Sequence, residues 1–165
     1  MNGESITAAG YKLTGVRLGE WQVSTERDCD TSTYTYNCSD PHRDFVVEKT
    51  FPHENYNPQS GNQHNDIALL RLSEKIINFT DFIRPICLTI DKSLRNIDLS
   101  NELMYVTGWG RTMNSAQSDI KQKVDLKGVS QGTCQVAYNL ANCLIASSQI
   151  CAGGEAGKDS CNGDR

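Results

Sequence analysis

Long apolar runs and blocks of like charge are both missing from this sequence. No stretch of its 165 residues approaches the roughly 18 consecutive apolar residues of a membrane-spanning helix. The 16 Lys and Arg residues are outnumbered by 20 Asp and Glu residues, the formal net charge is -4, and no basic cluster stands out. Nucleic acid and membrane surfaces are therefore not expected partners. Length and composition allow an ordinary globular domain.

Two familiar cofactor motifs are also missing. No CxxC pair occurs, which disfavours a zinc ribbon. The stretch AGGEAGKDS imitates a phosphate-binding loop, but Ala152 stands where the first glycine should be. Asp159 follows Lys158 where the loop needs a hydroxyl to bind magnesium, and its carboxylate would repel phosphate. The sequence predicts neither a zinc site nor a nucleotide site.

What the sequence does contain is cysteine in a spacing typical of disulfides. Eight, seven and nine residues separate the last four of the seven cysteines. The triplets at Asn37 (NCS) and Asn78 (NFT) match acceptors for N-linked sugars. An odd number of cysteines indicates a free thiol or a bond to a partner. We expect an extracellular protein, although MNGESITAAG lacks the features of a secretory signal, so a signal peptide would lie outside these residues.

The hydrophobic pattern predicts a mostly β protein. Short alternating or apolar runs separated by turn clusters such as NYNPQSGN are typical of a barrel or sandwich. The run DIALLRL looks like a buried strand. One short helix is expected from an N-cap at Ser130 to about Tyr138. The expected strands are residues 11–20, 44–51, 66–72, 104–110 and 122–130.

Asp66 opens the apolar run DIALLRL and has two interpretations. An isolated acid at this position is usually a carboxylate that caps a strand. Alternatively, it orients a catalytic histidine, because a carboxylate entering a buried strand is costly unless a donor engages it. The spacing alone leaves both interpretations open.

Four motifs in order resemble the chymotrypsin-like serine proteases: HNDIALL, RPICL, TGWG and QICAGGEAGKDSCNGD. The loop RDCDTSTYTYNCSDP resembles the extra cysteine-bounded loop of arthropod clip-domain proteases of the Easter and prophenoloxidase-activating kind. The resemblance covers nearly the whole chain. It implies an all-β fold of two six-stranded barrels. Residues 1–165 would be a partial single peptidase domain that lacks the N-terminal strands with the catalytic histidine and the C-terminal strands with the catalytic serine.

The resemblance assigns roles to particular residues. Asp66 matches the triad acid. Asp159, with Ser160 beside it, matches the base of the primary specificity pocket, which implies cleavage after Arg or Lys. Gly163 matches the oxyanion-hole glycine, and Asp164 matches the acid that receives the new N-terminus when a zymogen is activated.

The triad's nucleophile and base are not found among these residues. Arg165 occupies the position of the catalytic serine. The three histidines, His42, His53 and His64, do not lie in the family's Ala-Ala-His-Cys segment, so we interpret them as surface histidines without a catalytic role. This chain on its own is therefore expected to be inactive.

The resemblance also implies the cysteine pairs and a possible metal site. Cys29 would pair with Cys38, and Cys134 with Cys151. Cys87 would tether a light chain and Cys161 would bond outside these residues, whereas Cys143 has no assigned partner. No cofactor is required, but Glu20 resembles a calcium ligand, with Asp28, Asp30 or backbone carbonyls as possible companions.

The function implied is that of a secreted serine endopeptidase in an immune or developmental cascade, such as melanisation or Toll-ligand processing. Its partners would be proteins cleaved after Arg or Lys and serpin-type inhibitors. The alternative is a non-catalytic protease homologue that acts as a regulatory binding module. An unrelated disulfide-rich β domain is disfavoured by the four ordered motifs.

Overall fold

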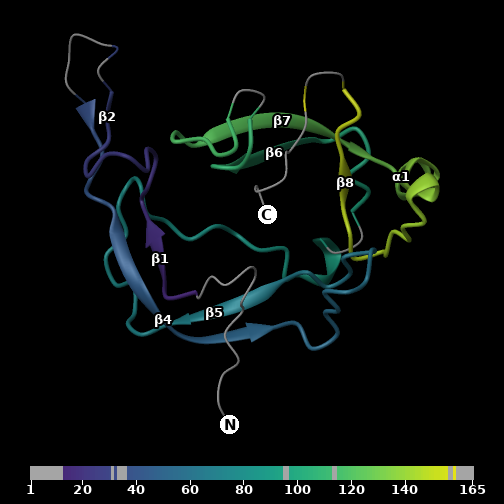
Figure 1. Ribbon diagram of the computed structural model, residues 1–165, viewed down its shortest axis with the longest axis horizontal. Coiled ribbons are helices and arrows are strands. Elements are labelled where there is room, and N and C mark those ends of the chain that lie inside the picture. Colours follow the sequence, from purple (N-terminus) through teal and green to yellow (C-terminus); the bar gives the residue numbers. More distant parts are fainter. Residues whose placement is uncertain are drawn as a thin grey trace. The chain divides into compact units, whose positions relative to one another are not determined.

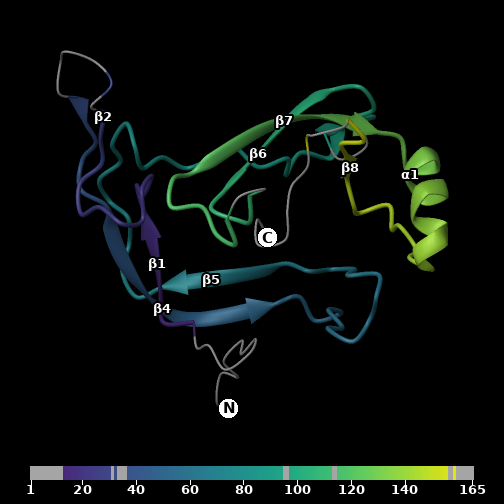
Figure 2. The same cartoon turned by 45° about the horizontal axis from the view of Figure 1, so that its top comes forward.

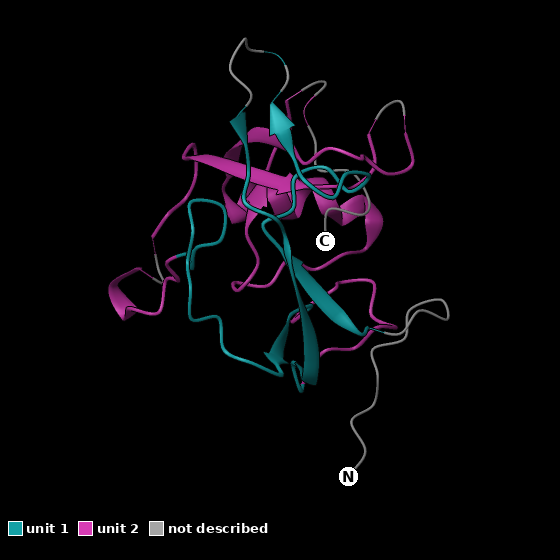
Figure 3. Cartoon of the chain, turned by 90° about the vertical axis from the view of Figure 1, so that its left-hand side faces the viewer, with its two compact units in different colours: residues 1–54, 66–86 teal, residues 55–65, 87–165 magenta. Residues whose placement is uncertain are grey.

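The computed structural model describes residues 13–30, 32, 37–94, 97–112, 115–155 and 158. These residues form mostly β-strands, with one short α-helix. The chain divides into two compact units (Figure 3). Unit 1 comprises Met1–Glu54 and Asp66–Ile86, and unit 2 comprises Asn55–Asn65 and Cys87–Arg165. In the described ranges no helix is both long and apolar enough to cross a bilayer.

Unit 1 contains a three-stranded antiparallel sheet in the order β1-β4-β5 (Figure 1). Its strands are β1 (Gly15–Leu18), β4 (Arg43–Pro52) and β5 (Ala68–Leu72). Arg17 lies opposite Asp44 in the register. Its guanidinium donates to both carboxylate oxygens of Asp44, at 2.7 and 2.8 Å. Such a bidentate pair fixes the register of β1 against β4.

A second, two-stranded element of unit 1 is β2 (Cys29–Asp30) paired with β3 (Asn37–Cys38). Cys29 lies directly opposite Cys38, and a disulfide joins them. The backbone N–H of Ser39 donates to the Asp28 carbonyl at 2.8 Å, which extends the pairing beyond the disulfide. These strands are too short to show periodicity in the sequence.

Unit 2 contains the antiparallel sheet β6-β7-β8 (Figure 2). Its strands are β6 (Leu103–Gly108), β7 (Gln122–Val129) and β8 (Cys151–Ala152). Two short 3-10 turns also belong to this unit, η1 (Lys92–Leu94) and η2 (Asn139–Ala141). Gly128 allows a close backbone approach in β7, because a Cβ there would lie 1.8 Å from the Leu99 carbonyl oxygen.

The expected helix is confirmed as α1 (Gln131–Tyr138). Ser130 is its N-cap, and the Ser130 hydroxyl accepts the backbone N–H of Thr133 at 3.3 Å. Cys134 is the one buried residue of α1. Because eight residues are too few for an isolated helix to be stable in water, α1 depends on its attachments to the rest of unit 2.

The prediction that residues 66–72 form a buried strand is wrong. Ile67 is 65% exposed and Leu69 is 71% exposed. β5 is an edge strand with β4 on one side only, so part of its apolar surface has no cover among the described residues. The described strands form open sheets and do not close a barrel. Few apolar side chains are buried among the described residues: Phe45 and Ile83 in unit 1, and Leu126 and Cys134 in unit 2.

Candidate active site

Asp66 lies two residues before the start of β5, at the end of a turn with unusual backbone. Gln63 and Asn65 adopt positive φ values of 52° and 60°, which favour a tight change of direction. The backbone N–H of His53 donates to the Ile67 carbonyl at 3.0 Å, which carries the β4–β5 pairing up to Asp66. The Asp66 side chain is exposed. The local backbone therefore presents this carboxylate at the end of a sheet.

The structure gives no support to the capping interpretation of Asp66. A capping carboxylate accepts backbone N–H groups. Among the described residues, the Asp66 carboxylate accepts no hydrogen bond. It is therefore free to accept one from a donor such as an imidazole.

The three histidines differ in their burial and in their contacts. His64 Nε2 donates to the Leu144 carbonyl at 2.7 Å. His42 is mostly buried, with Nδ1 3.9 Å from Glu20 Oε2. His53 is exposed. The interpretation of His64 as a satisfied, non-catalytic histidine agrees with its contact, whereas His42 is more buried than a surface histidine.

The predicted pocket residues Asp159 and Ser160 lie outside the described residues. So do Gly163, the predicted oxyanion-hole glycine, Asp164, the predicted partner of the new N-terminus, and Cys161. The described segment before them leaves β8 through Gly153 and Gly154, whose φ values are 108° and 88°. Gly153 N–H still donates to the Lys127 carbonyl at 2.9 Å, which holds this turn against β7.

Lys158, which precedes the predicted pocket acid, is held by two carboxylates. Its Nζ lies 3.0 Å from Asp125 Oδ2 and 3.5 Å from Glu155 Oε2. The hydrogen bond with Asp125 raises the pKa of Lys158, and the same contact lowers the pKa of Asp125. Two acids around this ammonium are unfavourable for phosphate, which agrees with the rejection of a phosphate-binding loop.

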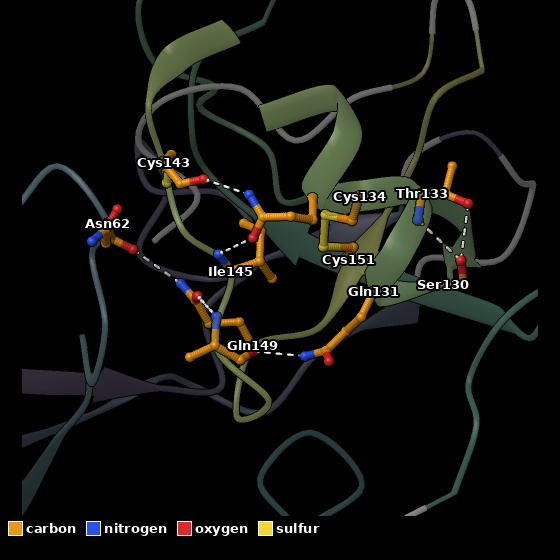
Figure 4. Close-up of a disulfide and its surroundings, with 11 residues drawn as sticks. Asn62, Ser130, Gln131, Thr133, Cys134, Cys143, Ile145, Gln149 and Cys151 are labelled. Atoms are coloured by element: carbon orange, nitrogen blue, oxygen red, sulfur yellow. Dashed lines mark hydrogen bonds between the residues drawn. A yellow bond between two sulfur atoms is a disulfide. The ribbon is translucent and has the colours of Figure 1, made fainter. Parts of the chain in front are cut away.

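A polar network in unit 2 was not predicted. It joins the loop before Asp66 to residues 143–149 (Figure 4). Asn62 Oδ1 accepts the backbone N–H of Leu144 at 2.7 Å, and the Asn62 carbonyl accepts Gln149 Nε2 at 3.2 Å. These partners are 82 and 87 residues apart and belong to no periodic pattern. The network fixes the backbone that leads towards Asp66.

The same region is attached to α1. Gln135 Nε2 donates to the Cys143 carbonyl, and Gln135 Oε1 accepts the Ile145 N–H, both at 2.9 Å (Figure 4). Gln131 Nε2 donates to the Ala146 carbonyl at 2.7 Å. Two glutamines of the helix therefore hold residues 143–146 through both donors and acceptors.

The disulfides of the described residues are the two pairs that the resemblance predicts. Cys29 is bonded to Cys38 and Cys134 to Cys151. Cys87 and Cys143 are free thiols; Cys87 is exposed, and Cys143 Sγ lies 3.7 Å from the Gly61 carbonyl.

Glu20 and Asp28 are buried carboxylates whose oxygens are occupied by donors. Both accept the backbone N–H of Trp21, at 3.0 and 2.9 Å. Asp28 also accepts the N–H of Gln22 and the hydroxyl of Thr25, at 3.2 and 2.6 Å. Burial raises the pKa of Asp28, but these hydrogen bonds outweigh it and leave the pKa below its usual value.

This arrangement does not fit a calcium ion. The guanidinium of Arg17 lies 3.3 Å from Glu20 Oε2, so the carboxylate of Glu20 is already paired with a positive charge. Asp30 is exposed, and its Oδ1 is bound by the N–H and hydroxyl of Ser32. Calcium needs six or more oxygen ligands. The part of the chain that the structure describes contains no group of three or more His, Cys, Asp or Glu side chains placed to bind a metal.

Comparison with known proteins places these features in one family. The family model described as Trypsin matches residues 18–165. Serine protease ea of Drosophila melanogaster is 43% identical over 165 residues, which are 99% of this chain and 42% of that protein. CLIP domain-containing serine protease HP8 of Bombyx mori is 44% identical over 94% of this chain and 41% of that protein.

Comparison with a solved structure indicates the same family. The chain resembles the Drosophila Grass clip serine protease of the Toll pathway with a TM-score of 0.69 and 33% identity, over 87% of this chain and 39% of that one. The chain therefore belongs to the trypsin family of serine proteases, and its similar relatives are insect clip-domain proteases. The predicted family and fold class are confirmed, and an unrelated β domain is excluded. The chain spans about two fifths of the length of these relatives.

Proposed function

We propose that this chain is part of a single peptidase domain of a secreted, trypsin-like serine endopeptidase that cleaves proteins after Arg or Lys in an extracellular cascade. The observation that carries this proposal is the exposed, unpaired Asp66 carboxylate at the head of β5, in a chain of the trypsin family. Its relatives include proteins named Melanization protease 1 and Spaetzle-processing enzyme, which supports a cascade role.

Asp66 would act through a histidine. Its carboxylate accepts the Nδ1–H of an imidazole, which leaves Nε2 free to take the proton of the attacking serine. When the imidazole becomes positively charged, the negative charge of Asp66 stabilises it. The Asn62 contacts support this role because they fix the loop that precedes the acid.

The remaining roles follow the family motif. Asp159, with Ser160, would bind the guanidinium or ammonium of the residue before the cleaved bond, because a charge-assisted pair is the strongest way to select such a side chain. The Gly163 N–H would bind the oxyanion of the tetrahedral intermediate. Asp164 would pair with the N-terminus that activation releases, and Cys87 with a light chain. Serpin-type inhibitors would bind at the same site as these substrates.

Residues 1–165 would contribute the acid and the pocket but neither the nucleophile nor the base. Arg165 stands where the motif has the serine, and the described histidines are engaged elsewhere or lie away from the motif. The three triad residues act as a unit, so the acid alone gives no turnover. No cofactor is needed for this chemistry.

The test is the substrate preference of the natural protein that contains residues 1–165. After activation it should hydrolyse chromogenic peptides that end in Arg or Lys and leave a matched peptide ending in Phe intact. Asp159→Ser should reduce hydrolysis after Arg by at least about 100-fold, because a buried charge pair loses one partner. Glu74→Gln, at an exposed residue of unit 1, is the matched control.

Two results would contradict the proposal. Preferential cleavage after Phe would remove Asp159 from the specificity pocket. Tight binding of a cascade protein without any hydrolysis would favour the regulatory homologue.

A further inference from the structure

Two triplets of this chain match acceptors for N-linked sugars, and the structure places them in different surroundings. We propose that Asn78 carries an N-linked oligosaccharide and that Asn37 does not. This inference rests on the secretory route that the proposed function requires. It goes beyond that function because it assigns a covalent modification to unit 1.

Asn78 lies in a segment without helix or strand, between the end of β5 and η1. Its side chain is exposed, and among the described residues its carboxamide makes no hydrogen bond. The backbone carbonyl oxygen of Asn78 accepts a hydrogen bond from Arg43 Nη1 at 3.1 Å. The backbone is therefore held in place while the reactive amide nitrogen points to solvent, where a large enzyme has access.

Thr80 supplies the hydroxyl that the acceptor triplet requires. Its Oγ1 accepts the N–H groups of Phe82 and Ile83 at 3.1 and 3.2 Å, and its own N–H donates to the Ile83 carbonyl at 3.0 Å. Among the described residues, Oγ1 is the acceptor in both of its contacts, so the hydroxyl proton remains available. This turn holds the half-buried Thr80 in a defined conformation two residues after the exposed Asn78.

The side chains around Asn78 also favour a sugar at this position. Ile77 is 75% exposed, Phe79 57% and Phe82 52%. Three large exposed apolar side chains within residues 77–82 of one surface segment favour association between molecules. A bulky hydrophilic oligosaccharide on Asn78 would shield them from such contacts.

Asn37 is exposed too, but its triplet is constrained throughout. Asn37 is paired with Asp30 in the β2–β3 ladder, and Cys38, the middle residue, is bonded to Cys29. The Ser39 hydroxyl donates its proton to the Asp40 carbonyl at 3.0 Å. The hydroxyl proton of this triplet is therefore already used, and disulfide closure competes with the transfer reaction for the same three residues.

The reaction needs a lipid-linked diphosphate oligosaccharide as its second substrate. The Asn78 amide nitrogen attacks the anomeric carbon, and the new C–N bond forms as the bond from this carbon to the diphosphate oxygen breaks. The amide loses one proton, and the lipid diphosphate leaves with the electron pair of the broken bond. No oxidant or reductant is involved.

The inference can be tested on the natural protein that contains residues 1–165, expressed in insect cells from its complete coding sequence so that its own N-terminal sequence decides the route. Treatment with a peptide N-glycanase in heavy-oxygen water converts each occupied asparagine into labelled aspartate, which peptide mass spectrometry locates. We expect label at Asn78 and none at Asn37. On a gel, Asn78→Gln should lose one glycan step relative to the wild type, whereas Asn37→Gln and Thr80→Ser should migrate like the wild type.

The Cys29–Cys38 bond, mapped in the same digest, separates the possible failures. If the bond has formed and Asn78 is unlabelled, or if the label lies on Asn37, the inference is wrong and the secretory route stands. If neither bond nor label is present, the secretory part of the proposed function is wrong and this inference falls with it. A label on Asn37 that appears only in Cys38→Ser would support the competition between disulfide and sugar.

Discussion

Removal of the Cys134–Cys151 disulfide should release α1 from unit 2. The bond joins residues 17 positions apart, and the loop-entropy model gives such a bond roughly 3 kcal/mol of stabilisation. Cys134 is the one buried residue of the eight-residue helix. An isolated helix of this length is not stable in water. The double substitution Cys134→Ala and Cys151→Ala should therefore lower the local free energy of unfolding of α1 by about 3 kcal/mol.

Hydrogen exchange followed by mass spectrometry measures this effect directly. A loss of about 3 kcal/mol accelerates exchange of the α1 amides on the order of 100-fold, since each 1.4 kcal/mol is a factor of ten. Peptides from β6 serve as the internal reference, because this strand has no contact with the disulfide in its ladder. Cys87→Ser is the matched control, since Cys87 is an exposed free thiol.

One result would refute this reasoning. If exchange in α1 is unchanged by the double substitution, then the contacts of Gln131 and Gln135 hold the helix without the covalent bond. The Ser130 cap and these glutamine contacts would then be the main source of its stability.

Three further predictions concern the site and its support. Asn62→Ala should raise hydrogen exchange at Leu144, because it removes the 2.7 Å hydrogen bond of an exposed N–H, which contributes about 0.5 to 1.5 kcal/mol. Asn62→Asp keeps an acceptor and should change little. Because the pKa of Asp28 lies below its usual value, the stability that Asp28 gives to the Trp21 turn is present above about pH 4 and is lost as the pH falls through the folded-state pKa. Trp21 fluorescence should report this transition in the wild type. If the transition persists in Asp28→Asn, another group titrates. Residues 1–165 alone should not hydrolyse an Arg-terminated chromogenic peptide above a buffer blank, and turnover that survives repurification but is abolished by Asp66→Ala would contradict this.

Much of the secondary structure could be predicted from the sequence. Alternating or apolar runs predicted the positions of β1, β4, β5, β6 and β7, and Ser130 marked the start of α1. The two-residue strands β2, β3 and β8 were not predicted, because a pair of residues has no measurable period. The burial of β5 was predicted wrongly, because an apolar run shows what a strand could bury and not whether a second layer covers it.

Less of the candidate site could be predicted from composition and spacing. The pattern singled out Asp66, but a lone acid before a strand is ambiguous, so only the resemblance assigned it the role of triad acid. The contacts of Asn62 with Leu144 and Gln149 could not be predicted, since single side chains meet across more than 80 residues of sequence. The roles of Asp159, Ser160, Gly163 and Asp164 remain predictions.

The most direct test of the catalytic role of Asp66 is its substitution by Asn in the natural protein that contains residues 1–165, with kcat/KM measured on an Arg-terminated peptide. Asp66→Asn should lower kcat/KM by about 10⁴-fold, the scale that loss of the triad acid has in serine proteases of this family, while the disulfides and the activation cleavage are unaffected. An activated Asp66→Asn protein that hydrolyses the peptide as fast as the wild type would show that this carboxylate does not orient the catalytic base.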